Sequence, residues 1–409
     1  MPGVKIGFFS DSYHPYMSGV VRSIEDFTRH LRQRGHEVYI FAPDYPGVDG
    51  KEDNIFRFPS LPAVTNKSFR LAIPYSMGIT EKVKELELDI IHSHSPFLLG
   101  RLALRLADKL DLPLVFTYHT LYDRYTHYVP GVSSLATRLV EKYVHSYCRR
   151  SDLVLTPSPF VRDMLGREGM ETPLRVQPTG VDLFAYAEAS GEGVRGEFGI
   201  GEDEDLLIFV GRLGQEKNLE FLLECGRLLL ESAGGGSESG GGAGTAARTG
   251  NRQRRLLLVG GGPERENLED LACKLGIKEQ VIFAGHQPPE RVKDLYAAAD
   301  LLVFPSLTET QGLVLLEAMA TGLPVVAIDA GGVSAVVDSG ENGFLVGEDR
   351  DEFCRAVDKL LADRDLYSAA AKKARTVAKE YSMENMTGSL LGYYRELLPG
   401  SGAEIIDSV

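Results

Sequence analysis

The stretch Pro305-Ser-Leu-Thr-Glu-Thr-Gln-Gly-Leu-Val-Leu-Leu-Glu-Ala-Met319 places two glutamates, Glu309 and Glu317, eight positions apart. The apolar run Leu301–Phe304 before it is a predicted strand, and Gly312–Thr321 has the apolar character of a helix. The unpaired N–H groups and the dipole at the start of such a helix favour a phosphate. The segment therefore predicts a strand–turn–helix unit that binds an anion between two carboxylates.

The start of this helix predicts the shape of the ligand. Gly312 allows close approach to the backbone, and Leu313 and Val314 supply unpaired amides. Eight helical residues rise about 12 Å, which is close to the reach of a sugar–diphosphate–ribose ligand. We therefore expect Glu309 to hold the sugar hydroxyls and Glu317 the ribose diol. The alternative is a capping glutamate followed by an exposed helical glutamate.

A second loop carries two cations. The predicted strand Leu206–Val210 is followed by Gly-Arg-Leu-Gly-Gln-Glu-Lys-Asn, with Arg212 and Lys217 five residues apart. Arginine offers a bidentate fork and lysine a point charge, and together they can neutralise a diphosphate whose charge grows as it departs. The alternative is a pair of solvated surface cations.

Strand and helix patterns alternate along the whole chain. The first half has predicted helices at Gly19–Arg34 and Leu98–Leu110. The predicted strands of this half are Val4–Ser10, Glu37–Ala42, Asp89–His92, Leu114–Tyr118 and Leu153–Thr156. Those of the second half are Leu206–Val210, Leu256–Val259, Val281–Ala284, Leu301–Phe304 and Pro324–Ile328. The rhythm predicts an α/β protein with two doubly wound parallel sheets, which bind ligands beyond the carboxyl ends of their strands.

Composition narrows the class of protein. A chain of 409 residues is longer than one core supports, so two domains are expected. Residues 1–178 carry 22 basic and 20 acidic side chains, whereas residues 179–409 carry 22 basic and 38 acidic ones. The net charge of −14 argues against a nucleic-acid partner. Four scattered cysteines and the lack of an 18-residue apolar run indicate reduced thiols and a cytoplasmic chain, at most peripheral to a membrane.

The E-x7-E spacing and the Gly-Arg-x4-Lys loop resemble those of retaining, nucleotide-sugar-dependent glycosyltransferases with the GT-B fold, and the resemblance covers nearly the whole chain. It implies two Rossmann-like domains that face a central cleft, joined near the Gly-Val-Asp at 180–182. The expected parts are an acceptor domain at 1–178, a nucleotide-sugar domain at 179–383 with a flexible glycine-rich loop at 233–255, and a C-terminal helix and tail at 384–409 that packs back on the first domain. The chain departs from the pattern at Gln311, where an aromatic side chain is commoner.

The same resemblance implies roles for individual residues. Catalytic roles fall to His119, Glu309, Arg212 and Lys217. Donor binding falls to Gly19, Arg212, Lys217, Gly285, His286, Glu309, Gly312, Leu313, Val314 and Glu317. No metal or other cofactor is expected, and the Asp203–Asp205 run is interpreted as a solvated acidic turn. The pair His92 and His94 is interpreted as strand-end packing, with a metal-ligand role as the alternative.

The run His119-Thr-Leu-Tyr-Asp-Arg-Tyr-Thr-His-Tyr128 resembles that of bacterial diacylglycerol glucosyltransferases and places Tyr122, Tyr125, His127 and Tyr128 on the acceptor side. Transfer of glucose from UDP-glucose to diacylglycerol at the cytoplasmic membrane face is the favoured function. Transfer to phosphatidylinositol or to a soluble acceptor, a UDP-sugar epimerase and a degenerate binding protein are the alternatives. Cations interleaved with aromatics, among them Arg57 and Arg70, predict an anionic-lipid surface, with ordinary amphipathic packing as the alternative.

Overall fold

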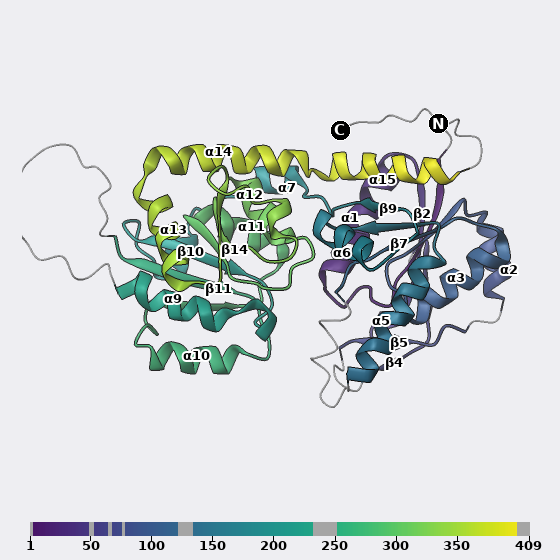
Figure 1. The fold of residues 1–409 in the computed structure, drawn as a ribbon, viewed down its shortest axis with the longest axis horizontal. Helices are drawn as coiled ribbons and strands as arrows, with labels where there is room; N and C mark the ends of the chain where they lie inside the picture. The colour runs from purple at the N-terminus through teal and green to yellow at the C-terminus, as the bar shows by residue number, and fades with distance from the viewer. Residues whose placement is uncertain are drawn as a thin grey trace, which may run out of the picture. The chain divides into compact units, whose positions relative to one another are not determined.

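The structure is a computed structural model that describes residues 3–48, 53–63, 68–75, 78–121, 134–231 and 252–398. It divides into two compact units, the first running to Gly180 and resuming at Met383, the second spanning Val181–Ser382 (Figure 1). The first division lies within the predicted hinge, and the last helix, α15 (Met383–Leu397), belongs to the first unit. Among the described residues, no helix combines the length and apolar character needed to cross a membrane.

The first unit contains a parallel seven-stranded sheet in the order β3-β2-β1-β6-β7-β8-β9. These strands are β3 (Ile55–Phe58), β2 (Glu37–Pro43), β1 (Lys5–Phe9), β6 (Ile90–Ser93), β7 (Leu114–Thr117), β8 (Leu153–Thr156) and β9 (Leu174–Val176). Its helices besides α15 are α1 (Gly19–Gln33), α2 (Ile79–Leu86), α3 (Leu98–Leu110), α5 (Ser134–Arg149) and α6 (Pro159–Arg167). A separate antiparallel pair is formed by β4 (Ser60–Pro62) and β5 (Arg70–Ala72).

Alternating side chains of this sheet build two cores. Phe8 of β1 belongs to the core that includes α1 and α15, whereas its neighbour Phe9 belongs to the core that includes α3 and α5. Successive residues of a strand point to opposite faces, and a parallel sheet is covered on both. The continuous apolar runs of the sequence follow from this double coverage.

The second unit contains a parallel six-stranded sheet in the order β12-β11-β10-β13-β14-β15 around one apolar core. Its strands are β12 (Val281–Gly285), β11 (Arg254–Val259), β10 (Asp205–Val210), β13 (Leu301–Phe304), β14 (Val325–Ile328) and β15 (Gly343–Val346). Its helices are α7 (Leu183–Ala187), α8 (Val194–Glu197), the 3-10 turn η2 (Gln215–Lys217), α9 (Leu219–Glu231), α10 (Arg265–Lys274), α11 (Pro289–Ala298), α12 (Leu313–Thr321), the 3-10 turn η3 (Val333–Ala335), α13 (Arg350–Ala362) and α14 (Arg364–Glu380).

Each sheet has a point where the strand order reverses direction. In the first unit this switch point lies between β1 and β6, and in the second it lies between β10 and β13. Open α/β sheets bind ligands beyond the carboxyl ends of the strands at such points. The segments that follow these four strands are therefore the places to look for a site.

Two interpretations of the sequence are wrong at the start of β10 and β11. Glu204 is not solvated: its side chain is buried, and it pairs with Arg255 at 2.9 Å and accepts the Gly201 amide at 2.7 Å. β11 begins at Arg254, two residues inside the predicted loop 233–255. Arg254 and Arg255 enter the strand because their backbones pair with β10 and their charges are neutralised by acidic partners.

Candidate active site

A lysine–glutamate pair lies at the switch point of the second unit. Lys217, in η2 after β10, makes an ion pair with Oε1 of Glu309, in the segment after β13. Ser306 Oγ donates to the same oxygen at 3.1 Å, and the Lys217 and Glu309 side chains are only 17% and 16% exposed. The cation and carboxylate predicted for the donor site are thus fixed together by two strand-end loops.

The turn after β14 holds the backbone of Glu309. Gly332 N–H donates to the carbonyl oxygen of Glu309 at 2.7 Å. Gly331 has a φ of +62°, and a Cβ at this position would collide with that same oxygen, so only glycine fits. Next to Glu309, the buried Oγ1 of Thr308 has no hydrogen-bond partner among the described residues. Thr308 therefore holds a buried, unused hydrogen-bonding group beside Glu309.

The helix α12 begins after Gly312, whose φ is +81°. The amides of Leu313 and Val314 have no hydrogen-bond acceptor among the residues that the structure describes. An α-helix leaves its first N–H groups unpaired, and these groups with the helix dipole attract an anion. These two amides are therefore open at the start of α12, four and five residues after Glu309, and their binding of a phosphate stays a prediction.

Glu317 differs from its expected environment. It is 3% exposed, and Oε2 accepts a hydrogen bond from the Tyr296 hydroxyl at 3.3 Å. The predicted 12 Å separation assumed eight helical residues, but only Leu313 onward is helical, so the rise to Glu317 is about 6 Å. Its contact with a ribose diol stays a prediction, while the exposed helical glutamate of the alternative is wrong.

The loop after β10 is pressed against the turn after β11. Leu213 N–H donates to the carbonyl oxygen of Gly261 at 3.0 Å, and a Cβ on Gly262 would lie 2.6 Å from the carbonyl carbon of Leu213. Arg212, in the same loop, is exposed and makes no ion pair with any described residue. Backbone packing therefore positions the loop, and the guanidinium is left as a charge at its surface.

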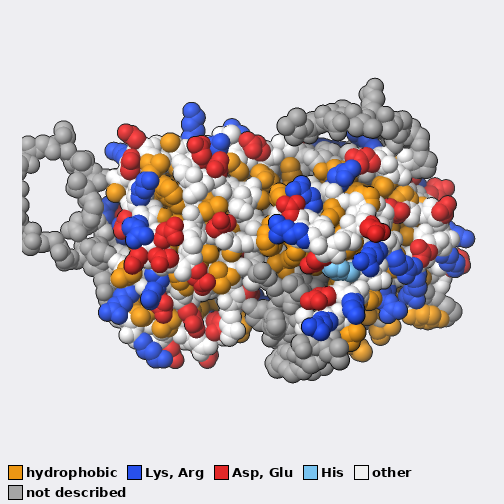
Figure 2. Space-filling model, viewed as in Figure 1, with side chains coloured by type: hydrophobic (Ala, Val, Ile, Leu, Met, Phe, Trp, Pro, Cys, Tyr) orange, Lys and Arg blue, Asp and Glu red, His pale blue; other side chains and the backbone are white. Residues whose placement is uncertain are grey.

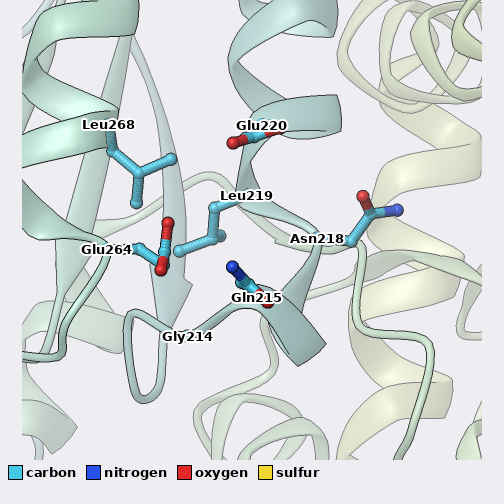
Figure 3. Close-up of a pocket in the computed structure, with 7 residues that line it drawn as sticks. All are labelled: Gly214, Gln215, Asn218, Leu219, Glu220, Glu264 and Leu268. Carbon is cyan, nitrogen blue, oxygen red and sulfur yellow. The ribbon is translucent and has the colours of Figure 1, made fainter. Parts of the chain in front are cut away.

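A pocket of about 250 Å³ lies beside this loop. Its lining residues are Gly214, Gln215, Asn218, Leu219, Glu220, Glu264 and Leu268 (Figure 3). Two of them are glutamates, which repel a diphosphate. Further along the sheet edge, Gly285 accepts the Gly260 amide at 2.8 Å and His286 is exposed, and the roles predicted for Gly285 and His286 near the base stay predictions.

The first unit carries Gly19 and His119, the remaining predicted residues that the structure describes. Gly19 opens α1, which is capped by Ser18 through a hydrogen bond from the Val21 amide at 3.3 Å. His119 follows β7, and its Nε2 lies 3.0 Å from Nδ1 of His94, which follows β6. Burial lowers the pKa of His119 to about 4, so the ring is neutral at pH 7.

The remaining acceptor-side predictions concern an aromatic segment and two arginines. Tyr122, Tyr125, His127 and Tyr128 lie outside the described residues. Arg57, one of the cations of the predicted lipid surface, donates its guanidinium N–H groups to the carbonyl oxygens of His14 (2.8 Å) and Pro43 (3.1 Å). Arg70 likewise donates to Ser60. These arginines bind backbone and hydroxyl groups within the unit, which favours the alternative of ordinary packing.

Sequence reasoning missed several residues that build the site. Ser306 and Thr308 lie inside the deciding segment, but hydroxyl side chains in a turn give no sequence signal of their own. Gly331 and Gly332 did carry a signal, since this glycine pair comes shortly after the predicted strand Pro324–Ile328. Among the described residues, no three histidine, cysteine, aspartate or glutamate side chains gather as metal ligands.

Comparison with known proteins agrees with this architecture. Residues 192–377 match the family of glycosyl transferases group 1, and residues 17–183 match glycosyltransferase family 4. The chain therefore belongs to these glycosyltransferases, which are enzymes, and its two parallel-sheet units form the GT-B fold.

Individual relatives extend over most of the chain. An alpha-monoglucosyldiacylglycerol synthase of Streptococcus pneumoniae is 33% identical over 79% of this chain and 71% of its own. A protein of the same name from Acholeplasma laidlawii is 27% identical over 97% and 98%. The solved structure of Anabaena Alr3699/HepE in complex with UDP and glucose superposes with a TM-score of 0.73 at 21% identity, covering 96% of this chain and 100% of that one.

Proposed function

We propose that the protein is a retaining glucosyltransferase that moves glucose from UDP-glucose to a hydroxyl of diacylglycerol at the cytoplasmic face of a membrane. The observation that carries the donor half is the Lys217–Glu309 pair at the switch point, followed directly by the open amides of α12. A cation and helix N–H groups bind a diphosphate, and a neighbouring carboxylate accepts hydrogen bonds from sugar hydroxyls. This combination fits a nucleoside-diphosphate sugar.

The chemical step follows from where charge develops. The bond between the anomeric carbon and the phosphate oxygen breaks, the acceptor oxygen bonds to the same face of that carbon, and the acceptor proton passes to the departing phosphate. Arg212, Lys217 and the amides of Leu313 and Val314 stabilise the growing negative charge. Glu309 is bound by Lys217 and Ser306, so we assign it to positioning the sugar and propose no covalent intermediate and no metal.

The acceptor half rests on the relatives. Both synthases reported above are named for a glucosyldiacylglycerol product and together match nearly the full chain. The β4–β5 region of the first unit offers apolar side chains that are exposed, namely Leu61, Leu71, Ile73 and Tyr75. Figure 2 shows hydrophobic and basic side chains close together on this unit. Such a surface suits contact with the membrane that holds the acceptor.

To test this proposal, the purified full chain is incubated with UDP-glucose in mixed micelles, with and without diacylglycerol. The release of UDP and the formation of glycolipid are both measured. Diacylglycerol-dependent formation of an α-glucoside supports the proposal. If product forms only with phosphatidylinositol or with a soluble acceptor, diacylglycerol is not the acceptor. If the product is an epimerised nucleotide sugar, the protein is an epimerase and not a transferase. Lys217→Met should lower turnover by about 10²-fold or more. The matched control is Lys372→Met on α14, an exposed lysine outside the site.

A further inference from the structure

The carboxylate of Glu309 is held at only one of its two oxygens. The ammonium of Lys217 and the hydroxyl of Ser306 both donate to Oε1, the hydroxyl at 3.1 Å. Oε2 has no hydrogen-bond partner among the residues that the structure describes. Each carboxylate oxygen can accept about two hydrogen bonds, and the Glu309 side chain is 16% exposed. Oε2 is therefore the oxygen that Glu309 can offer to a ligand.

Ser306 occupies a fixed position where two loops meet. It follows the end of β13 by two residues and is 0% exposed. Its Oγ also lies 3.4 Å from the carbonyl oxygen of Glu216 in η2, and that carbonyl accepts the Leu307 amide at 3.3 Å. A hydroxyl has one proton to donate, and the Glu309 carboxylate is the nearer and the charged acceptor. The Ser306 hydroxyl therefore holds Glu309 from a buried, well-defined place.

The backbone of Glu309 is fixed as well, so only its side chain is left to adjust. The Gly332 amide donates to the Glu309 carbonyl oxygen at 2.7 Å, and a Cβ on Gly331 would lie 2.2 Å from that oxygen. The turn after β14 thus sets where the Glu309 side chain starts. The direction of the carboxylate then depends on the two groups that bind Oε1.

The two groups that bind Oε1 respond differently to a bound donor. Lysine is a point charge on a flexible four-carbon stem, so the ammonium of Lys217 is drawn toward the diphosphate that it stabilises in the proposed function. Its hold on Glu309 then weakens, because the phosphate competes for the same charge. Ser306 is neutral and buried, and its hydroxyl stays on Oε1. Ser306 is therefore the partner that keeps the carboxylate in place while the donor is bound.

We propose that Ser306 is a positioning residue that fixes the Glu309 carboxylate, so that Oε2 accepts hydrogen bonds from hydroxyls of the transferred sugar and discriminates among sugars. A site built to bind a hydroxyl rejects a donor whose hydroxyl is missing or misplaced, because its own polar group is then left unpaired. An acceptor that is free to turn discriminates less, since it can follow a misplaced hydroxyl. This assignment deepens the proposed function and rests on it for the nature of the donor.

Calorimetry with UDP and with UDP-glucose separates contacts to the sugar from contacts to the nucleotide. Ser306→Ala should weaken UDP-glucose binding about 10-fold and UDP binding less than about twofold, and the retained UDP binding shows that the variant is folded. The matched control is Thr321→Val at the far end of α12, which removes a hydroxyl that donates to the Ala318 carbonyl oxygen at 2.8 Å. It should leave both affinities within about twofold. Equal weakening of both ligands by Ser306→Ala, or no weakening, overturns the proposal.

A double-mutant cycle tests whether Ser306 acts through Glu309. In a Glu309→Ala background the carboxylate is absent, so Ser306→Ala should change the affinity for UDP-glucose less than about twofold. A loss of about 10-fold in this background as well would mean that Ser306 acts by another route, and it overturns the proposal.

Sugar selectivity is the decisive readout, because a merely structural role would slow all donors alike. The kcat/KM for UDP-glucose is compared with those for UDP-galactose and for the 2-deoxy, 3-deoxy and 4-deoxy analogues of UDP-glucose. In Ser306→Ala the discrimination against at least one of them should fall about 10-fold, and in Thr321→Val none should change. If the wild type forms glycolipid and Ser306→Ala keeps every ratio, only this proposal fails. If the wild type neither binds nor consumes UDP-glucose, the proposed function fails and this proposal fails with it.

Discussion

Replacing Gly262 with alanine should destabilise the second unit and displace the loop that carries Arg212 and Lys217. An alanine Cβ would lie 2.6 Å from the carbonyl carbon of Leu213. Nonbonded carbon atoms are most favourable at about 3.5 Å or more, so one of the two loops must move by about 1 Å. Forcing atoms into a closely packed site costs about 1–3 kcal/mol of unfolding free energy.

Gly261→Ala is the matched control because a Cβ at Gly261 has no atom within 4 Å and its φ is not positive. This change should leave stability within about 0.5 kcal/mol of the wild type. Since the chain contains no tryptophan, urea unfolding is followed by far-ultraviolet circular dichroism, and midpoints are compared at a common slope. A Gly262→Ala variant as stable as Gly261→Ala would refute the close packing of the two loops.

The same displacement should appear in the kinetics. A shift of about 1 Å in groups that position a substrate can lower kcat/KM by about 10²-fold. The KM for UDP-glucose and the affinity for UDP alone, measured by calorimetry, should both weaken in Gly262→Ala. A destabilised variant with unchanged UDP affinity would mean that the loop does not hold the diphosphate.

Three further outcomes are expected. Arg212→Ala should lower kcat/KM for UDP-glucose by about 10²-fold with little change in the urea midpoint, because the guanidinium is exposed and makes no ion pair with any described residue. Burial lowers the pKa of His119 to about 4 and also lowers the pKa of His92, so at mildly acidic pH the unfolded chain binds more protons than the folded chain; the unfolding free energy from urea titrations should therefore fall as the pH is lowered from 7.5 to 5, by up to about 1.4 kcal/mol per pH unit for each such histidine, and less steeply in His92→Asn. Of the four free thiols, only that of Cys273 is exposed, so an aromatic disulfide reagent should titrate one thiol quickly in the native protein and four in urea.

The regular elements were predictable where burial is complete. Leu153–Thr156 and Leu301–Phe304 have the same bounds in the sequence prediction and in the structure, because each is a fully buried apolar run. The helix Leu98–Leu110 also keeps its predicted bounds, because its apolar residues recur with helical spacing on one buried face. The strands β9 and β15 were missed. Both lie at sheet edges. The strand β9 is three half-buried or exposed residues with an arginine at its centre, and β15 is a short run after a glycine whose two middle residues are only half-buried.

The sequence by itself determined the parallel α/β class, the loops that follow the strands and the residue types that these loops carry, since these depend on local periodicity and turn chemistry. Only the tertiary structure decided which loops meet. Strand order brings Lys217 to Glu309 across 92 positions and His94 to His119 across 25. It also buried Glu317 against Tyr296 and left His94 Nε2 without a partner among the described residues. Such pairings depend on the order of the strands in the sheet and on packing between distant segments, so they cannot be predicted from the local sequence around each residue.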